Sequence, residues 1–471
     1  MRGQRLAATG LAVVLASACA VGPNYMRPPV TPPEDFRGHV DAPEATSIAD
    51  LPWWEVFEDE VLQQLILESL GANYDLKTAV YRVEQAKAQV GVAQSPFYPQ
   101  VGYQGSAGRQ GVPQLKSQPA DTFNLFYGAF SLAWEIDIWG RIRRSNEAAQ
   151  QQLFATEEFR RGVLLSLVTS VAQSYLTLLE LDRELEIATD TAQSFQETLD
   201  LFTRRYQGGV GNKLQVARAE AALAVTQAQI PDLERLIVIQ ENALCVLLAR
   251  NPGPIPRGTP LAERRGPPAT PPGLPSTLLE RRPDILQAEH VITSANAQVG
   301  VAVADFFPRI GLTALYGGQS TELKDIVKQN FSLWNVAGNA AGPLFQGFLL
   351  LEQYRGQVAG WEQTKAQYEQ TVLNSFSEVS NTLTAQTKFA EALTTQTHAV
   401  HAYQESVRLS LLRYNSGLAG YFEVLEAQQL LFPAEIALAR LQLDQLLTVV
   451  TLYRALGGGW QLTDAQWMQR P

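Results

Sequence analysis

Two regions of the chain alternate between apolar residues and polar or small ones. In residues 126–138 six large apolar side chains lie at even positions, which are Phe126, Phe130, Leu132, Trp134, Ile136 and Ile138. A period of two gives a strand one apolar face and one polar face. Residues 97–108, 307–317 and 332–342 alternate in the same way, less strictly. The pattern predicts two β-hairpins, at about 97–138 and about 306–342.

Longer regions follow the helical period instead. Helices are expected over residues 57–94, 140–207 and from there to about 250, and again over 277–304, 347–415 and 421–456. A helix of about 68 residues would be ~100 Å long and needs neighbouring helices for support. Gly208-Gly-Val-Gly211 and Asn415-Ser-Gly417 break these regions. Pro231 and Pro433 are expected to kink the helices that follow the breaks.

The two sets of elements are copies of one unit. Ala88-Gln-Val-Gly-Val-Ala93 recurs as Ala297-Gln-Val-Gly-Val-Ala302, and Arg205-Tyr206 recurs as Arg413-Tyr414. The offset between copies is therefore 209 residues at the hexapeptide and 208 at the Arg-Tyr pair. A repeat of this length indicates one structural unit built twice. We expect repeats at 57–250 and 276–460, a Pro-rich linker at 251–275 and a C-terminal tail at 461–471.

The N-terminus has the features of a secretory signal. Arg2 and Arg5 precede a short apolar stretch, and Ala16-Ser-Ala-Cys19 follows it. This predicts a signal peptide at 1–18 and a lipid on Cys19, with 19–56 as an extended arm. Ala16 stands where bacterial lipoprotein signals usually have Leu, so ordinary cleavage after Ala18 is the alternative.

Composition and charge exclude several function classes. The formal charge is −10, or −12 after loss of the signal peptide with its two arginines, and no Lys/Arg cluster points to nucleic acid. No motif for phosphate binding or nucleophilic catalysis is present. His398 and His401 have helical spacing, but nothing nearby offers a third metal ligand. We expect no enzyme activity, no catalytic or metal-binding residues, and no cofactor beyond the lipid on Cys19.

The strands fit an outer-membrane barrel. Its lipid face would carry Phe126, Phe130, Leu132, Trp134 and Ile136. A soluble sheet packed on helices would show the same alternation. Ala20 rather than Asp follows Cys19, which by resemblance to bacterial lipoproteins favours the outer membrane, and this address favours the barrel. Four strands are too few to close a barrel, and lipid does not tolerate open edges, so other copies of the chain must complete it.

Four segments carry a family resemblance. They are Val21-Gly-Pro-Asn-Tyr-Met-Arg-Pro28, Leu279-Glu-Arg-Arg-Pro-Asp-Ile285, Arg413-Tyr-Asn-Ser-Gly417 and Tyr453-Arg-Ala-Leu-Gly-Gly-Gly-Trp460. With the repeat, they resemble the NodT-type lipoprotein branch of the TolC-like outer-membrane efflux proteins. The resemblance implies a mainly α fold with a long α-helical barrel. It also implies a homotrimer, in which four strands per chain complete a transmembrane β-barrel of twelve strands.

The same resemblance implies roles for the breaks between helices. They would be periplasmic tips that dock an adaptor protein through Arg205, Tyr206, Gly209, Arg413, Tyr414 and Gly417. Gate candidates beside the second tip are Leu418, Ala419, Tyr421, Phe422 and Glu423. Family members often have an acidic or amide residue where this chain has Ala419, which puts a charged ring at that level in doubt.

The leading function is therefore an exit duct in the outer membrane of a Gram-negative bacterium. It would serve a tripartite efflux pump for small molecules or drugs, with an inner-membrane pump of the resistance-nodulation-division type. The alternatives are a duct for type I protein secretion, a duct for metal ions, and a lipid-anchored coiled-coil scaffold without a pore.

Overall fold

The structure is a computed structural model that describes residues 20–33, 35–37, 47–112, 121–264 and 277–468. The expected signal peptide and Cys19 lie outside the described residues. The chain divides into two compact units. Unit 1 comprises Met1–Val30, Tyr81–Glu157 and Gln287–Gln370. Unit 2 comprises Thr31–Val80, Glu158–Leu286 and Thr371–Pro471.

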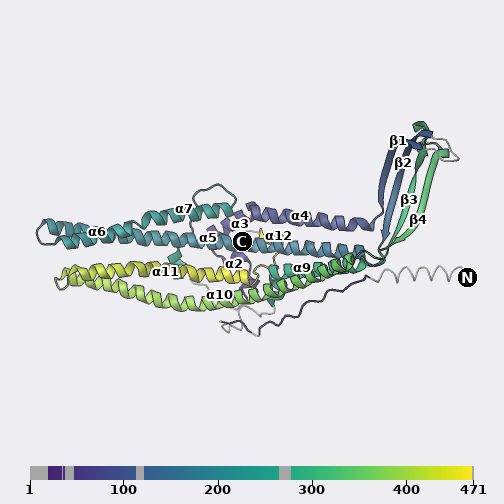
Figure 1. The fold of residues 1–471 in the computed structure, drawn as a ribbon. Coiled ribbons are helices and arrows are strands. Elements are labelled where there is room, and N and C mark those ends of the chain that lie inside the picture. The colour runs from purple at the N-terminus through teal and green to yellow at the C-terminus, as the bar shows by residue number, and fades with distance from the viewer. Residues whose placement is uncertain (1–19, 34, 38–46, 113–120, 265–276, 469–471) are drawn as a thin grey trace. The chain divides into compact units, whose positions relative to one another are not determined.

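Unit 1 contains the four predicted strands as a single antiparallel sheet (Figure 1). The strands are β1 (Gln100–Val112), β2 (Asp121–Ile136), β3 (Arg309–Ser320) and β4 (Ser332–Ala341). Their order in the sheet follows the chain, so β1 and β4 are the two edges. The first three strands start or end a few residues from the predicted bounds, because alternation does not mark the point where pairing stops.

Equivalent helices flank the strands in the two repeats. α4 (Tyr74–Gln94) leads to β1, and α9 (Pro283–Ala304) leads to β3. α5 (Arg141–Gln207) follows β2 and α10 (Leu349–Asn415) follows β4, and each has 67 residues. The residue before each of these long helices, Gly140 and Phe348, has a positive φ. A left-handed residue thus precedes both long helices, and before α10 the preceding Gly347 is left-handed as well.

The helix expected over residues 57–94 is two helices, α3 (Glu60–Ala72) and α4, separated at Asn73. The Asn73 side chain accepts hydrogen bonds from the backbone N–H groups of Asp75 and Leu76, at 2.8 and 3.0 Å. Asparagine in this position caps a new helix by satisfying N–H groups that have no partner within it. The apolar period continues across the break, so the pattern did not reveal it.

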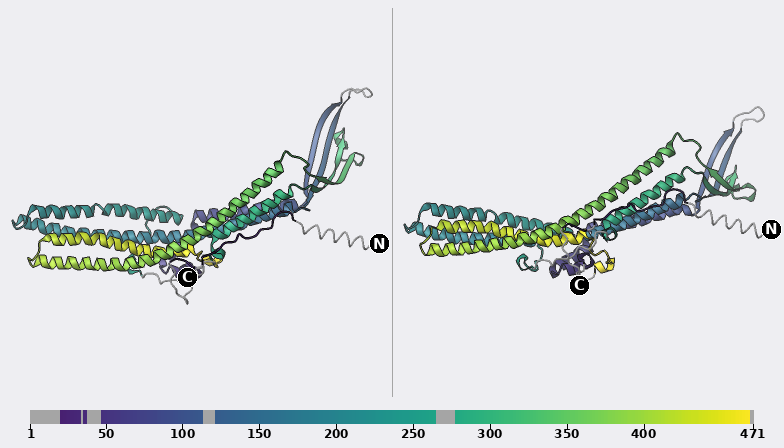
Figure 2. Two further views of the ribbon diagram at one scale, coloured as in Figure 1. Left: turned by 60° about the horizontal axis from the view of Figure 1, so that its bottom comes forward. Right: turned by 90° about the horizontal axis from the view of Figure 1, so that it is seen from below.

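Unit 2 contains two helical hairpins that lie side by side in the views of Figures 1 and 2. One joins the end of α5 to α6 (Lys213–Gln227) and α7 (Ile230–Leu247), and the other joins α10 to α11 (Tyr421–Ala455). Pro231 lies in the first turn of α7, where its missing N–H costs nothing, so the helix breaks there. α11 continues through Pro433.

Short helices occupy segments that were expected to be irregular. The arm contains η1 (Ile48–Asp50) and α2 (Trp53–Val56), and the C-terminal tail contains α12 (Asp464–Trp467). The helix expected over 277–304 is also divided, into α8 (Leu278–Arg281) and α9, because Arg282 precedes Pro283 and has an extended backbone. The remaining short elements are η2 (Ser95–Phe97), η3 (Leu261–Glu263), η5 (Leu323–Asp325) and η6 (Gln329–Phe331). The side chains of Trp53 and Trp467 are both buried, and the indole N–H of Trp53 donates to the Trp467 carbonyl at 3.4 Å.

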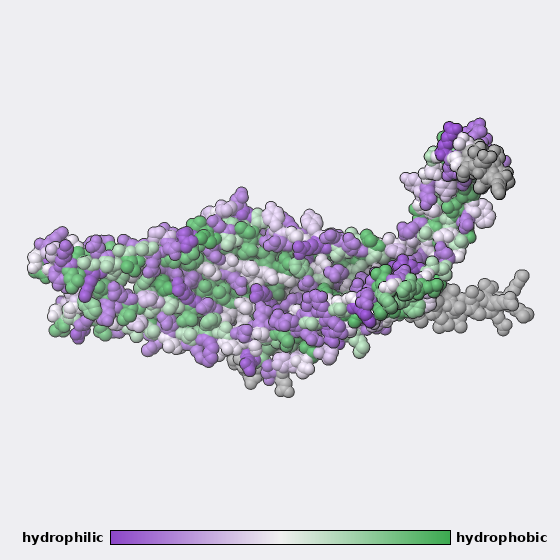
Figure 3. All heavy atoms as spheres, viewed as in Figure 1, coloured by the Kyte–Doolittle hydropathy of each residue, from purple (hydrophilic) through white to green (hydrophobic). Residues whose placement is uncertain are grey.

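The core of unit 2 forms along α5. Val168, Val171, Ala172, Tyr175 and Leu178 are fully buried. By length and composition α5 and α11 could each cross a membrane, but 61% of the apolar window of α5 is buried inside the protein. Burial by neighbouring helices is the usual reason for such a helix in a soluble region. The face of unit 2 seen in Figure 3 mixes apolar and polar residues.

Candidate functional site

The sheet of unit 1 has one apolar face. Its strand register aligns Tyr103, Phe130, Tyr316 and Trp334 in a single row across all four strands. These four side chains are between 65% and 85% exposed. The row two residues further along β2 consists of Val101, Leu132, Ala314 and Val336. Large apolar side chains exposed in adjacent rows require a nonpolar medium or a partner.

The opposite face of the sheet is mostly polar or small, with Leu315 as an exception in the rows given next. One of its rows is Gln100, Ala133, Thr313 and Ala337, and the next is Gly102, Ser131, Leu315 and Asn335. The two faces therefore differ in the way expected of strands that separate lipid from water. The five residues assigned to the lipid face, Phe126, Phe130, Leu132, Trp134 and Ile136, share the apolar face because they have the same parity on β2.

The N-terminal arm binds at the junction between strands and helices in unit 1. The Val21 N–H donates to the carbonyl of Trp139 at 3.0 Å, just after β2. Arg144 is almost fully buried and donates to Asn24 Oδ1 at 2.7 Å. Asn296 on α9 donates to the Pro23 carbonyl at 3.0 Å. These bonds fix the residues that directly follow Cys19.

Glycines allow the arm to approach so closely. Gly22 has φ +94°, and a Cβ there would lie 2.5 Å from the Cα of Gly300. Gly140, with φ +80°, faces Ala20, and a Cβ would lie 2.7 Å from the Ala20 Cα. Only glycine combines the left-handed backbone with this separation. The family-like segment that begins at Val21 is thus a strap bound across this junction. Gly22, Gly140 and Gly300 set its path.

Both helix breaks in unit 2 have the same hydrogen-bond pattern. Gly209 and Gly417 have φ of +75° and +72°. The following N–H groups, of Val210 and Leu418, donate to the carbonyls of Arg205 and Arg413, each at 2.9 Å. This is the Schellman ending of a helix, which requires a left-handed residue and favours glycine. The repeated Arg-Tyr-x-x-Gly pattern therefore has a structural cause at both turns.

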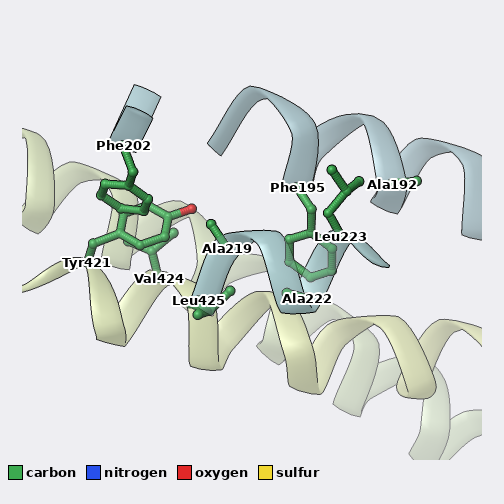
Figure 4. Packing of buried hydrophobic residues seen from close by; sticks show 9 residues of the cluster. All are labelled: Ala192, Phe195, Phe202, Ala219, Ala222, Leu223, Tyr421, Val424 and Leu425. Atoms are coloured by element: carbon green, nitrogen blue, oxygen red, sulfur yellow. The ribbon is translucent and has the colours of Figure 1, made fainter. Parts of the chain in front are cut away.

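A buried apolar cluster lies beneath the turns (Figure 4). It joins α5, α6 and α11 through nine residues, which are Ala192, Phe195, Phe202, Ala219, Ala222, Leu223, Tyr421, Val424 and Leu425. The ring of Tyr421 meets Phe202 edge to face, with centroids 4.3 Å apart. Burial raises the pKa of the Tyr421 hydroxyl. The structure therefore places this gate candidate inside the cluster, where its ring packs against α5.

Most of the other predicted tip residues are exposed, whereas Tyr414 is partly buried against the cluster. Arg205 stacks on the ring of Tyr414 with its guanidinium carbon 4.9 Å from the centroid, and also donates to the Tyr414 hydroxyl. Arg413 and Glu423 form an exposed ion pair of 3.3 Å. Three of the tip residues have large exposed fractions, which are 47% for Tyr206, 73% for Leu418 and 57% for Phe422. Ala419 is half-buried, between the turn and α11.

A groove of about 450 Å³ opens in unit 2 between α6 and α11. Its apolar lining includes Val225, Phe422, Leu425 and Phe432. Arg218 also lines the groove, and its guanidinium carbon lies 5.3 Å from the centroid of the Phe422 ring. An apolar groove with a cation at its side suits the apolar face of a peptide or helix. The alternation and helix periods gave no sign of this groove.

Two of the family-like segments meet in unit 2. Arg282 is buried and donates to the carbonyl of Ala455 at 2.6 Å, near the end of α11. Glu378 on α10 forms ion pairs with both Arg282 and Arg454, each at 3.0 Å. A buried guanidinium needs such partners, because an unpaired buried charge is costly. These motif residues therefore hold three segments of unit 2 together.

Sequence reasoning missed several residues of these surfaces. Thr198 and Gln428 both bond to the Tyr421 side chain, and Arg144 holds the arm. The spacing of Phe195 and Phe202, seven residues apart on α5, was the available signal for the cluster. Within the described ranges, no group of three or more His, Cys, Asp or Glu side chains could hold a metal ion.

Comparison with known proteins gives a consistent result. The model of the family described as "Outer membrane efflux protein" matches residues 65–250 and 274–458, one match for each repeat. The probable efflux pump outer membrane protein TtgC of Pseudomonas putida is 32% identical over 95% of this chain and 94% of its own. The cation efflux system protein CusC of Escherichia coli is also 32% identical, over 94% and 96%.

A lipoprotein relative and a solved structure agree with these matches. The probable outer membrane lipoprotein SilC of Salmonella typhimurium is 31% identical over 95% of this chain and 97% of its own. The structure of the outer-membrane channel OprN superposes with a TM-score of 0.85 at 29% identity, covering 94% of this chain and all of that one. The chain belongs to the outer membrane efflux protein family and is an outer-membrane efflux channel rather than an enzyme.

Proposed function

We propose that three copies of the chain form one channel, with twelve strands in the membrane and the long helices as a tunnel in the periplasm. The sheet supports this proposal most directly, because β1 and β4 are its edges and its apolar face is exposed. Unpaired strand edges in lipid would leave backbone groups without hydrogen bonds, at several kcal/mol each. Closure by other copies removes the edges and leaves the polar face around a water-filled path.

The proposal includes a lipid on Cys19. The strap supports it, since Ala20 and Val21 are held beside Gly140 and Trp139, directly after a strand with a lipid-facing side. An acyl chain on the preceding residue would then start close to the membrane surface. The relative SilC is described as a lipoprotein, which is consistent with this anchor.

We further propose that the two turns dock a periplasmic adaptor, which connects the channel to an inner-membrane pump of the resistance-nodulation-division type. The names of the P. putida relatives, as outer membrane proteins of efflux pumps, support a pump partner. The exposed residues Tyr206, Arg413, Leu418 and Phe422 would make the contact. Leu418, Phe422 and Glu423 would also narrow the tunnel, while Tyr421 holds the turn from inside.

Charge reversal tests the docking. Arg413→Glu should reduce the amount of adaptor recovered with the channel, because the cation at the tip becomes an anion. The double variant Arg413→Glu with Glu423→Arg restores the ion pair in reverse. If recovery returns in the double variant, the pair acts by shaping the turn. If the single variant recovers as much adaptor as the wild type, Arg413 is not part of the docking surface.

The cargo is proposed to be small amphiphilic organic molecules. Relatives are described as efflux proteins for antibiotics, for toluene and for cations. Soft cations prefer thiolate and thioether ligands, and this chain has only two Cys and three Met. The polar and small side chains of the proposed lining would not select one specific ligand. The pump would therefore select the cargo.

Growth of a deletion strain tests the cargo. Hypersensitivity to several unrelated dyes, detergents and antibiotics, reversed by the wild-type gene, is the expected result. Sensitivity confined to metal salts would reassign the channel to cation export. Loss of a protein from the culture supernatant, without drug sensitivity, would favour the secretion alternative.

A further inference from the structure

The apolar face of the sheet has a gap next to the row of aromatic side chains that begins at Tyr103. On the side toward the segment between β3 and β4, the next row (the glycine row) consists of Gly105, Gly128, Gly318 and Ser332. Each of them is two positions from an aromatic residue of the same strand, so all four share the apolar face. Three glycines and a serine leave this row without large side chains, and the apolar surface of the sheet is interrupted there.

An apolar band that spans a membrane has to include the glycine row. From Ile136 to Phe130, β2 advances about 20 Å at ~3.4 Å per residue, which is about 16 Å along the membrane normal at a tilt of about 40°. The apolar band of an outer-membrane barrel is about 25 Å high. Continuing to Phe126, one row past Gly128, brings the band to about 26 Å. The glycine row therefore falls inside the band, about 5 Å from the limit that is farther from the helices.

The segment between β3 and β4, residues 321–331 (the β3–β4 loop), folds back over the glycine row. A Cβ on Gly128 would lie 3.5 Å from Ile326 Cδ1, and a Cβ on Gly318 would lie 1.9 Å from the Ile326 carbonyl oxygen. Both Cβ positions point to the apolar face, so the loop lies on this face of the sheet. Glycine in a strand commonly marks such a close approach by another backbone. The missing side chains thus make room for Ile326.

The β3–β4 loop pairs many of its own polar groups. In η5 the N–H of Asp325 donates to the Glu322 carbonyl at 3.1 Å. At η6 the N–H of Phe331 donates to the Lys328 carbonyl at 2.9 Å. The lysines of the loop form ion pairs inside it, Lys324 with Glu322 and Lys328 with Asp325. Polar groups that are paired in this way are less costly to place at the edge of a nonpolar medium.

Apolar side chains of the β3–β4 loop are exposed beside the sheet. Leu323, Val327 and Phe331 follow each other at a spacing of four residues and are 63%, 89% and 37% exposed. Together with the apolar sheet face next to them, they form a continuous surface that requires a nonpolar medium or a partner. Lys324 and Lys328 are also largely exposed. Their long side chains can reach the headgroup level while the stems stay in apolar surroundings.

We propose that the β3–β4 loop is a membrane contact of the channel, which inserts Leu323 and Val327 among the acyl chains of the outer leaflet. Ile326, held in the glycine row, fixes the depth of the loop. The loop supplies the apolar surface that the sheet lacks there, at the depth of about 5–10 Å that is usual for elements lying in a membrane interface. This inference rests on the proposed facing of the sheet toward lipid and adds a second lipid contact to it.

Spin labels on single introduced cysteines measure the depth of the β3–β4 loop. The mature protein is labelled at Val327→Cys and reconstituted in phospholipid vesicles. Collisions of the label with oxygen, which collects among acyl chains, are compared with collisions with a water-soluble nickel chelate. Tyr103→Cys reports the apolar face of the sheet, and Gln319→Cys reports the polar face at the height of the loop. Wild-type protein treated in the same way gives the background from Cys19 and Cys245.

The ratio of oxygen to nickel collisions is expected to be several-fold higher at Val327→Cys and Tyr103→Cys than at Gln319→Cys. A nickel-accessible label at Val327→Cys beside an oxygen-accessible label at Tyr103→Cys would overturn the loop contact and leave the facing of the sheet standing. A label at Val327→Cys that meets neither probe would mean that another copy covers the loop, which also overturns the contact. A nickel-accessible label at Tyr103→Cys would remove both the facing and the contact.

Substitution in the glycine row tests whether it holds the loop. Gly318→Ala, made in the Val327→Cys background, places a methyl group against the Ile326 carbonyl and should raise the nickel accessibility of the label several-fold. Gly105→Ala is the matched control in the same row, because its Cβ would lie 3.9 Å from the nearest neighbour, the Tyr127 carbonyl oxygen. Equal accessibility in the two variants would overturn the role of the glycine row in fixing the loop.

Discussion

The hydroxyl oxygens of Thr198 on α5 and Tyr421 on α11 lie 2.6 Å apart inside the apolar cluster beneath the helix turns. The Tyr421 hydroxyl is also 3.3 Å from Gln428, whose amide donates to the Ser194 hydroxyl at 2.9 Å. A short polar chain therefore crosses the cluster from α11 to α5. Buried hydroxyls that are paired in this way specify one packing arrangement, because any other leaves them unpaired.

Removing the Tyr421 hydroxyl should loosen this end of the two hairpins. In Tyr421→Phe the Thr198 hydroxyl loses its cross-helix partner, which costs about 1–3 kcal/mol of local stability. Hydrogen exchange at the amides of Val424 and Leu425 measures the loss. Tyr206→Phe is the matched control, since Tyr206 is exposed and outside the cluster. Equal exchange in the two variants would show that the hydroxyl pair does not hold the turn.

A pair of buried carboxyls on α5 should make stability depend on pH. Burial and the adjacent Glu184 raise the pKa of Glu180 to about 8, with Asp444 adding to the effect and Arg440 opposing it. Arg440 Nε lies 2.7 Å from Glu184 and 4.0 Å from Glu180. In the unfolded chain the Glu180 carboxyl would ionise near 4.5.

The direction in which stability changes with pH depends on whether the folded or the unfolded state holds the proton. Below about pH 4.5 both states are protonated at Glu180, whereas between 4.5 and about 8 only the folded state keeps the proton. The stabilising contribution is therefore lost as the pH rises through 8. The thermal midpoint at a fixed scan rate should fall from pH 6 to pH 8.5, and by less in Glu180→Gln. Glu186→Gln, exposed on the same helix, should keep the wild-type dependence.

Loss of the Asn24 side chain should weaken the binding of the strap to the junction. Asn24→Ala removes one acceptor of buried Arg144, which also bonds to Glu147 and to the Val21 carbonyl, and a hydrogen bond to a charged group contributes about 1.5–3 kcal/mol. The Val21 amide, bonded to Trp139, should then exchange faster with solvent. Met26→Ala changes an 83% exposed residue of the same segment and should leave the exchange unchanged. Protection that survives Asn24→Ala would show that the other contacts of the arm, such as the bond from Asn296 to the Pro23 carbonyl, hold it without Asn24.

The facing of the strands has a direct test in adjacent residues. Leu132→Arg places a charge on the apolar face and should cost ~2–4 kcal/mol if it lies near the bilayer midplane. Ser131→Arg places the same charge on the polar face, where water is expected, and should be tolerated. The amount of channel assembled in the outer membrane measures both effects. Equal assembly of the two variants would contradict the assignment of the faces.

Local periodicity was enough to predict most of the fold. The strands and the two long helices follow from periods of two and of 3.6, and the repeat showed that the elements come in equivalent sets. The split at Asn73 was not predicted, because a side-chain cap can end one helix and start the next without changing the apolar period. The break at Pro231 was expected as a kink and occurs as a helix start.

Residues of the candidate surfaces could be predicted only where a local backbone conformation favours one amino acid. Gly209 and Gly417 could be placed because a left-handed helix ending favours glycine. Tyr421 could not be assigned to the inside or the outside, since α11 has apolar residues on several faces. The contacts of Arg144 and Thr198 join segments more than 100 residues apart, and no local pattern encodes such pairs.

The proposed closure of one channel by several copies of this chain is tested most directly by the native mass of the mature protein in mild detergent. A stable particle of three chains is expected, because only added copies can pair the β1 and β4 edges. A stable particle of one chain, folded and with its lipid attached, would contradict it.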